Sequence, residues 1–259
     1  TYPAAFSTGL SNVSAVDAGP DGRLIAVGSG TGKIVVWDTE ARKPVDTGIT
    51  ATGLVSSVRF SPDGKLLAIS ILDNNLRNAG VRIWDIAADK QVAKLGGSNT
   101  PAIGQVSWRP DGRAIAALAT EQNDSQGIVE WDARTGQPIK TLAKGIVDSL
   151  SVAYSPAGDR LAVGRGDGSV ELWDTTTSTR INRQTQHADT TTVRGPNGVI
   201  PVQVTFSDTL LASSSLADNM IRLWNPRTGE PVRAFPDITR QAGSAVAPGP
   251  TSLAFSSDG

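Results

Sequence analysis

The chain has 259 residues, of which 39% are hydrophobic, and its 24 basic and 25 acidic side chains give a formal net charge of -1. Cysteine is absent, which excludes disulfides, thiolate catalysis and cysteine-based zinc sites. The charges are evenly mixed without a basic run, so nucleic acid is not an expected partner. No apolar stretch approaches the roughly 18 residues of a membrane-spanning helix.

A Trp-Asp pair recurs along the chain at spacings of 47, 47, 42 and 51 residues. The pairs, the last with Asn in place of Asp, begin at Trp37, Trp84, Trp131, Trp173 and Trp224. A turn signal of the Ser-Pro-Asp-Gly type precedes the first four pairs, and the fifth has only Ser-Asp. These signals lie at residues 19–22, 61–64, 109–112, 155–158 and 207–208, and a last one closes the chain at 256–259. Because a recurring period indicates a repeat architecture, each period is interpreted as one structural unit.

The second unit shows the predicted elements most clearly. Its strand-like runs are Val55–Phe60, Lys65–Ile71, Gly80–Trp84 and Gln91–Leu95. Several short runs of β-branched and aliphatic residues at even spacing favour an all-β architecture. The second run of each unit is apolar on both faces, which requires cover on both sides of the sheet.

Four strands per unit, a Ser-Pro-Asp-Gly turn after the first and Trp-Asp at the end of the third resemble the WD-repeat (WD40) β-propeller family. The resemblance covers nearly all of residues 10–259 and implies one all-β propeller domain, 1–259, built from four-stranded antiparallel blades. Five complete blades and part of a sixth are expected, in a ring that is incomplete in this chain. The blades are placed at residues 10–49, 52–96, 102–143, 147–185 and 200–236, with the partial blade at 250–259 and a possible closing strand at 1–8.

The resemblance also implies that each Trp packs between blades and that each Asp caps the next turn. Family members often bury a network of Asp, His, Ser and Trp, with the His ahead of a first strand. The single histidine here, His187, is not followed at once by such a strand. Asp167 and Asp218 match the Asp position of the network, and Ser29, Ser70 and Ser213 lie near its Ser position. We therefore expect blades held mainly by apolar stacking, with His187 in an exposed loop.

The stretch Gly-Ser-Gly-Thr-Gly-Lys-Ile at 28–34 is similar to a loop that cradles a phosphate. A P-loop, however, needs four residues between its first Gly and the Gly-Lys pair, and a helix after it. The stretch has a near-twin at 164–170, and the first Gly of each lies nine residues ahead of the Trp that ends the third strand. Recurrence in register predicts a structural hairpin in both places. The Arg-Gly-Asp tripeptide at 165–167 is interpreted as the tip of the second hairpin.

The sequence contains few residues suited to catalysis or metal binding. One histidine cannot form a His-based metal cage, and a Ser-His-Asp triad would have to use His187. Most aspartates lie in tight turns or after Trp, where backbone donors explain them. The sequence predicts no catalytic, cofactor-binding or metal-ligating residue. Catalysis by carboxylates from different blades and a calcium ion in the central channel are left open.

Loop lengths point to one face. The extra residues fall between second and third strands or between consecutive units, and up-and-down strand order puts both kinds of loop on one rim, the loop face. The opposite rim, the turn face, carries the short Pro-Asp-Gly and Trp-Asp turns. Long loops on a rigid scaffold concentrate binding residues, although unconstrained drift in loop length is the alternative. The predicted protein contacts are Asn74, Asn75, Arg77, Asn78, Gln122, Asn123, Asp124, Arg165, Asp167, His187, Arg194, Asp218 and Asn219.

The sequence therefore predicts a non-catalytic scaffold that binds a protein or peptide on the loop face, without cofactor, nucleic acid or membrane span. The alternative is a regulatory or sensor propeller fused to a signalling enzyme, such as a kinase or a STAND-type ATPase. A propeller hydrolase is the third interpretation. We expect a piece of a longer, bacterial, cytoplasmic protein, because the chain starts at Thr1, ends within a repeat and is rich in Arg and Ala.

Overall fold

In the structure, a computed structural model, the chain forms two compact units. The first comprises Thr1–Gln122 and Glu130–Lys140, and the second comprises Asn123–Val129 and Thr141–Gly259. The residues that the structure describes are 9–72, 80–96, 102–120, 126–146, 149–187, 202–215, 218, 220–236 and 253–255.

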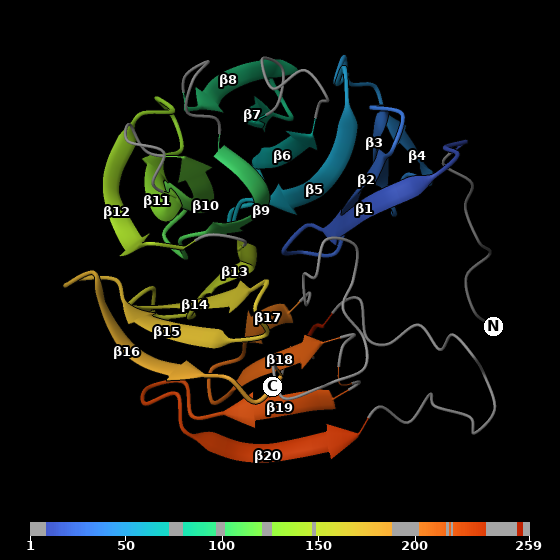
Figure 1. The fold of residues 1–259 in the computed structure, drawn as a ribbon. Helices are drawn as coiled ribbons and strands as arrows, with labels where there is room; N and C mark the ends of the chain where they lie inside the picture. Colours follow the sequence, from blue (N-terminus) through green and yellow to red (C-terminus); the bar gives the residue numbers. More distant parts are fainter. Residues whose placement is uncertain are drawn as a thin grey trace. The chain divides into compact units, whose positions relative to one another are not determined.

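Five antiparallel sheets of four strands each form the blades, and in every sheet the strands lie in chain order (Figure 1). The first two are β1 (Val13–Ala18), β2 (Leu24–Ser29), β3 (Ile34–Asp38) and β4 (Lys43–Val45), then β5 (Leu54–Phe60), β6 (Leu66–Leu72), β7 (Gly80–Asp85) and β8 (Lys90–Leu95). The third is β9 (Ala102–Trp108), β10 (Ala114–Thr120), β11 (Gln126–Asp132) and β12 (Pro138–Lys144). The last two are β13 (Ser149–Tyr154), β14 (Arg160–Arg165), β15 (Val170–Asp174) and β16 (Thr179–Gln184), then β17 (Val202–Phe206), β18 (Leu211–Ser215), β19 (Met220–Trp224) and β20 (Pro231–Pro236).

Turn chemistry fixes both kinds of short connection. In the second blade the Ser61 hydroxyl donates to Asp63 at 2.6 Å, and the Asp63 carboxylate accepts the Lys65 amide at 3.1 Å. After each third strand, the residue following Trp accepts one or two backbone amides of the next turn, as the resemblance implied. These acceptors are Asp38, Asp85, Asp132, Asp174 and Asn225.

The apolar second strands are buried on both faces, as predicted. In β6 every residue from Leu67 to Ile71 is buried. One core cluster gathers residues of β2, β3, β5 and β6 in the first unit. A second cluster gathers residues of β14, β15, β17 and β18 in the second unit. The blades are therefore held by stacking of neighbouring sheets.

The two glycine-rich stretches are hairpins, as predicted, and they are also packing joints. Residues 30–33 connect β2 to β3, and 166–169 connect β14 to β15. A Cβ atom on Gly28 would lie 2.4 Å from Val55 Cγ1, and one on Gly164 would lie 2.4 Å from the Val202 carbonyl oxygen. Both glycines are required because the first strand of the next blade passes directly over them.

The expected partial sixth blade is not found. Residues 253–255 are described and form no strand, and no strand follows β20 in the described part of the chain. The prediction of a partial blade from the repeat pattern ending at 256–259 was therefore wrong. A single β-strand is not stable without a hydrogen-bonded neighbour. The proposed closing strand at 1–8 lies outside the described residues.

Candidate functional site

Nine of the thirteen predicted contact residues lie outside the residues that the structure describes. They are Asn74, Asn75, Arg77, Asn78, Gln122, Asn123, Asp124, Arg194 and Asn219. Of the other four, Arg165 and Asp167 lie at the hairpin between β14 and β15, while His187 and Asp218 meet beside the fifth blade. The structure therefore separates the described candidates into two clusters.

Arg165 takes part in a charge cluster centred on Glu171, whose side chain is fully buried in β15. Arg165 Nη1 lies 3.0 Å from Glu171 Oε1, and Trp173 Nε1 donates to Glu171 Oε2 at 2.9 Å. The guanidinium of Arg180 reaches the same carboxylate at 3.3 Å, and that of Arg183 approaches it to 3.8 Å. Arg165 thus neutralises a buried charge, which makes it part of the scaffold of this blade.

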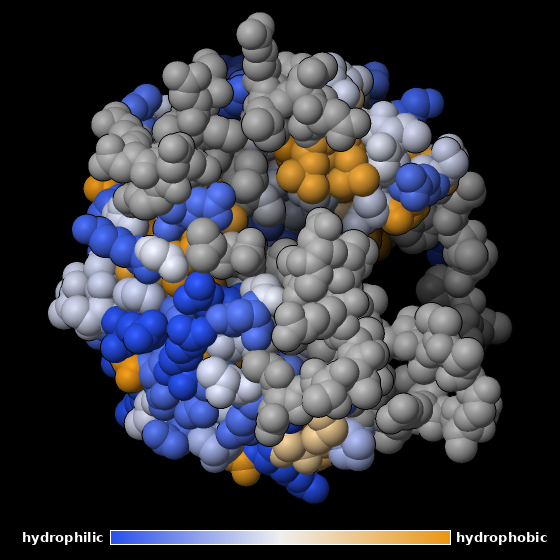
Figure 2. Space-filling model, viewed as in Figure 1, coloured by the Kyte–Doolittle hydropathy of each residue, from blue (hydrophilic) through white to orange (hydrophobic). Residues whose placement is uncertain are grey.

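Asp167 joins the same cluster from the hairpin. Burial opposes its ionisation, yet the hydroxyl and amide of Ser169 and the charge of Arg183 bring its pKa below the ordinary value. Arg183 Nη2 lies 2.5 Å from Asp167 Oδ2. Figure 2 shows strongly hydrophilic surface over β15 and β16. The carboxylate is ionised and already paired at neutral pH.

His187 is fully buried, which corrects its prediction as an exposed loop residue. Its Nδ1 lies 2.9 Å from Asp218 Oδ2, and its Nε2 lies 2.8 Å from Ser213 Oγ, which also accepts the indole N–H of Trp224 at 2.8 Å. The fifth blade therefore has the complete polar network that was not expected. His187 has no exposed surface with which to contact a partner.

The network favours a neutral imidazole. Burial lowers the pKa of His187 below its ordinary value, although the Asp218 carboxylate opposes the shift. Burial also opposes ionisation of Asp218, but His187 and Arg222 bring its pKa below the ordinary value. Arg222 Nη1 forms an ion pair with Asp218 and lies 2.8 Å from His187 Nδ1. With the proton on Nδ1, the Trp224 indole N–H donates to Ser213 Oγ, the Ser213 hydroxyl donates to His187 Nε2, and His187 Nδ1–H donates to Asp218.

Three aliphatic side chains are exposed at the loop-face ends of β1, β5 and β6, and we call them the loop-face patch. Val13 is 53% exposed, Leu54 39% and Leu72 43%. Leu54 and Leu72 are cross-strand partners. Ser14 Oγ, next to Val13 in β1, donates to the carbonyl oxygen of Val55, next to Leu54 in β5, at 2.7 Å. Figure 2 shows apolar surface over β1 and over β5.

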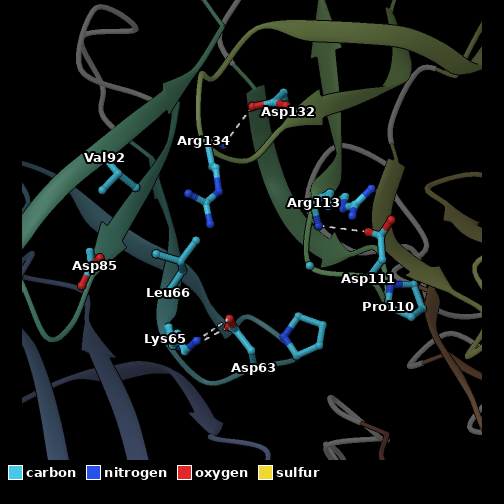
Figure 3. A pocket seen from close by; sticks show the side chains of 12 residues that line it. Asp63, Lys65, Leu66, Asp85, Val92, Pro110, Asp111, Arg113, Asp132 and Arg134 are labelled. Carbon is cyan, nitrogen blue, oxygen red and sulfur yellow. Dashed lines mark hydrogen bonds and ion pairs between the residues drawn. The ribbon is translucent and has the colours of Figure 1, made fainter.

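A groove of about 880 Å³ lies on the turn face between the second and third blades, and we call it the turn-face groove (Figure 3). It is lined by the β5–β6 turn, the β9–β10 turn, parts of β7 and β8, and the turn after β11. The loop lengths, which pointed to the loop face, did not predict this groove. A sequence signal existed, since the third unit alone places Arg after both its Pro-Asp-Gly turn (Arg113) and its Trp-Asp pair (Arg134).

The described residues hold no group of three His, Asp or Glu side chains arranged to bind a metal ion. In the same residues, no helix has the length and apolar character to cross a membrane.

Comparison with known proteins identifies the repeats. Residues 5–38, 43–85 and 136–174 match the family model described as "WD domain, G-beta repeat", so the chain contains WD40 repeats. A solved chain titled "Crystal Structure of Mitotic Checkpoint Complex" matches with a TM-score of 0.69 and 21% identity, covering 91% of this chain and 70% of that one. This likeness confirms the fold as an all-β propeller, here with five four-stranded blades.

Relatives occur in plants and in a bacterium. "Cell division cycle 20.5, cofactor of APC complex" of Arabidopsis thaliana is 30% identical over 229 residues, covering 85% of this chain and 45% of the relative. "Cell division cycle 20.1, cofactor of APC complex" of the same plant is 27% identical, and the match covers 76% of this chain and 41% of that relative. An "Uncharacterized WD repeat-containing protein" of Deinococcus radiodurans is 24% identical, and the match covers 68% of this chain and 74% of that relative. The chain spans less than half the length of the two plant relatives, and its bacterial source stays a prediction.

Proposed function

We propose that this chain, with its WD40 repeats in a β-propeller, is a non-catalytic scaffold that binds a protein partner on its loop face. The comparisons support the role by analogy. The plant relatives are named as cofactors of a complex, and the similar solved chain belongs to a checkpoint complex. Fold alone does not determine function, so the argument depends on the surface of this chain.

The loop-face patch is the observation that carries the proposal. Val13, Leu54 and Leu72 expose aliphatic side chains at the ends of strands whose backbones are fixed by the sheets. Exposed apolar side chains gathered on a rigid surface are typical of protein-binding sites. The backbones of these strands are already ordered, so binding need not order them, which lowers the entropic cost of the complex.

The experiment compares two matched double variants. Leu54→Ser with Leu72→Ser removes the centre of the patch, whereas Ile181→Ser with Val232→Ser removes exposed aliphatic side chains from the outer strands β16 and β20. A partner is first purified with the wild-type chain from the source cells and identified. Its affinity for each variant is then measured by calorimetry.

We expect the patch variant to lose roughly 2 kcal/mol or more of binding free energy, as truncated hot-spot residues do, while the outer-strand variant binds like the wild type. Circular dichroism checks that both variants stay folded. Equal affinities for the two variants would remove the loop face from the proposal.

A further inference from the structure

The turn-face groove is a preformed feature of the first unit, because the second and third blades touch on both sides of it. On one side, a Cβ atom on Gly112 would lie 3.8 Å from Pro62 Cδ. On the other side, a Cβ atom on Gly136 would lie 2.2 Å from the carbonyl oxygen of Lys94 in β8. Turns that are this close hold the walls of the groove in place.

The carboxylates that line the groove are already occupied. Asp63 accepts the Ser61 hydroxyl, and Asp111 accepts two hydrogen bonds from the Arg109 guanidinium, at 3.0 and 2.8 Å. Asp132 accepts the backbone amides of the turn after β11, and Asp85 accepts one amide of the turn after β7. Their negative charges are therefore satisfied by the protein itself.

Two guanidinium groups of the groove have no direct partner among the described residues, although their charges help to lower the pKa of the nearby Asp111 and Asp132. Arg113 and Arg134 both line the groove, and neither guanidinium has a hydrogen bond or ion pair with any residue that the structure describes. In Figure 3 the Arg134 side chain extends from the turn after β11 toward Leu66. The groove thus combines two available cations with the apolar side chains of Leu66 and Val92.

We propose that the turn-face groove binds an acidic peptide segment of a protein partner, with one carboxylate at Arg113, a second at Arg134, and an aliphatic side chain beyond Arg134, against Leu66 and Val92 (Figure 3). Guanidinium groups match carboxylates because their parallel N–H donors fit both oxygens. A nucleic-acid backbone suits the groove less well. It carries a continuous row of phosphates, whereas the groove offers two guanidinium groups beside apolar side chains.

This surface is separate from the loop-face patch, so it would be a second binding site. Leu66 lines the groove at the start of β6, and Leu72 belongs to the patch at the end of the same strand. A strand of this length separates its two ends by about 20 Å. The two sites can therefore be tested independently.

The test uses fluorescein-labelled peptides that carry two Glu residues followed or preceded by one Leu, over a series of spacings. Each has a matched peptide with Gln in place of Glu. Binding to the whole chain is followed by fluorescence anisotropy at low and high salt. The variants are Arg113→Ala, Arg134→Ala and, as matched control, Arg227→Ala, which occupies the turn position equivalent to Arg134 in the fifth blade.

For at least one spacing, we expect the Glu peptide to bind about tenfold more tightly than its Gln counterpart, with added salt reducing the difference. Arg113→Ala and Arg134→Ala should each weaken it by about tenfold, and Arg227→Ala should not. A charge swap sharpens the result, since Arg134→Glu should bind a Lys-containing peptide better than the Glu peptide.

Three results would overturn the proposal. These are no binding at any spacing, equal binding of Glu and Gln peptides, and an Arg134→Ala variant that binds like Arg227→Ala. Because neither guanidinium has a hydrogen bond or ion pair with a described residue, and an alanine keeps the backbone amide bonds to Asp111 and Asp132, loss of folding is not expected to obscure the comparison. Variants of Leu54 and Leu72 should bind these peptides normally, which separates this test from that of the loop face.

Discussion

Ser213 is the residue on which the polar network of the fifth blade depends. Its hydroxyl accepts the Trp224 indole N–H and lies within hydrogen-bond distance of His187 Nε2, and all three side chains are buried. Removing the hydroxyl leaves two buried polar groups without a partner. The cost of such a change is the desolvation of both groups, which exceeds the net worth of one hydrogen bond.

We predict that Ser213→Ala lowers the free energy of unfolding by about 2 kcal/mol or more. The matched control is Ser214→Ala, since Ser214 is equally buried but its hydroxyl has no hydrogen-bond partner among the residues that the structure describes. That variant should be nearly neutral. Urea denaturation measures both, and equal losses in the two variants would show that the network contributes nothing beyond packing.

Arg165 illustrates the limit of residue-level prediction from sequence. At the tip of a glycine-rich hairpin it was interpreted as a surface contact, whereas its side chain pairs with the buried Glu171 at 3.0 Å. The sequence contains both residues but not the register that brings them together. Truncating Arg165 would leave a buried carboxylate with fewer partners, so this residue is unsuitable for testing partner binding.

The elements themselves were accessible from sequence. In the second blade the predicted runs agree with β5, β6, β7 and β8 to within one residue at each end. Short apolar runs between turn signals determine strands locally, without tertiary information. The His187 network was missed because His187 and Ser213 are 26 residues apart, across an unusually long connection. The turn-face groove was missed because it is formed by two blades, and neither blade alone encodes its shape.

The turn after Trp131-Asp132 in the third blade packs against the second blade, and Gly136 shows how closely. Its φ is +69°, and an added Cβ would lie 2.2 Å from the Lys94 carbonyl oxygen. Gly22 has a similar φ of +71°, but an added Cβ would meet nothing within 4 Å. The two glycines therefore share the conformational requirement and differ only in packing.

We predict that Gly22→Ala costs about 1–2 kcal/mol of stability, the strain of a left-handed residue, and that Gly136→Ala costs at least about 2 kcal/mol more because β8 must move away. Thermal and urea unfolding of the two variants provide the comparison. Similar losses would mean that the turn after β11 can shift without disturbing β8. The larger loss should be accompanied by weaker peptide binding in the turn-face groove, which this contact borders.

At the scale of the whole molecule, the carboxylates of the turns after Trp and the buried histidine make folding stability depend on pH in the same direction. The backbone amides of the turns lower the pKa of Asp38, Asp132 and Asp174. Their contribution is present above the ordinary aspartate value and is lost as the pH falls below it. Asp17 has the opposite sign, because burial raises its pKa despite the nearby Arg59.

His187 adds an earlier stage to this acid response. Burial lowers its pKa in the folded chain, so below the ordinary value of about 6.5 the unfolded chain binds a proton that the folded chain does not. Stability is therefore complete above about pH 6.5 and falls as the pH decreases through the range down to the folded pKa. Because a single proton is involved, the free energy of unfolding can change by at most about 1.4 kcal/mol per pH unit from this cause.

We predict that the wild-type chain loses stability between pH 7 and 5, before the turn carboxylates protonate, and that His187→Gln flattens this part of the curve. His187 is the single histidine of the chain, so no other imidazole can produce the same slope. The free energy of unfolding from urea titrations at half-unit pH steps measures it, and the comparison is between slopes because the substitution itself lowers stability. If the decline from pH 7 to 5 persisted in His187→Gln, the buried imidazole could not be its cause, and the neutral form assigned to it in the folded blade would be wrong.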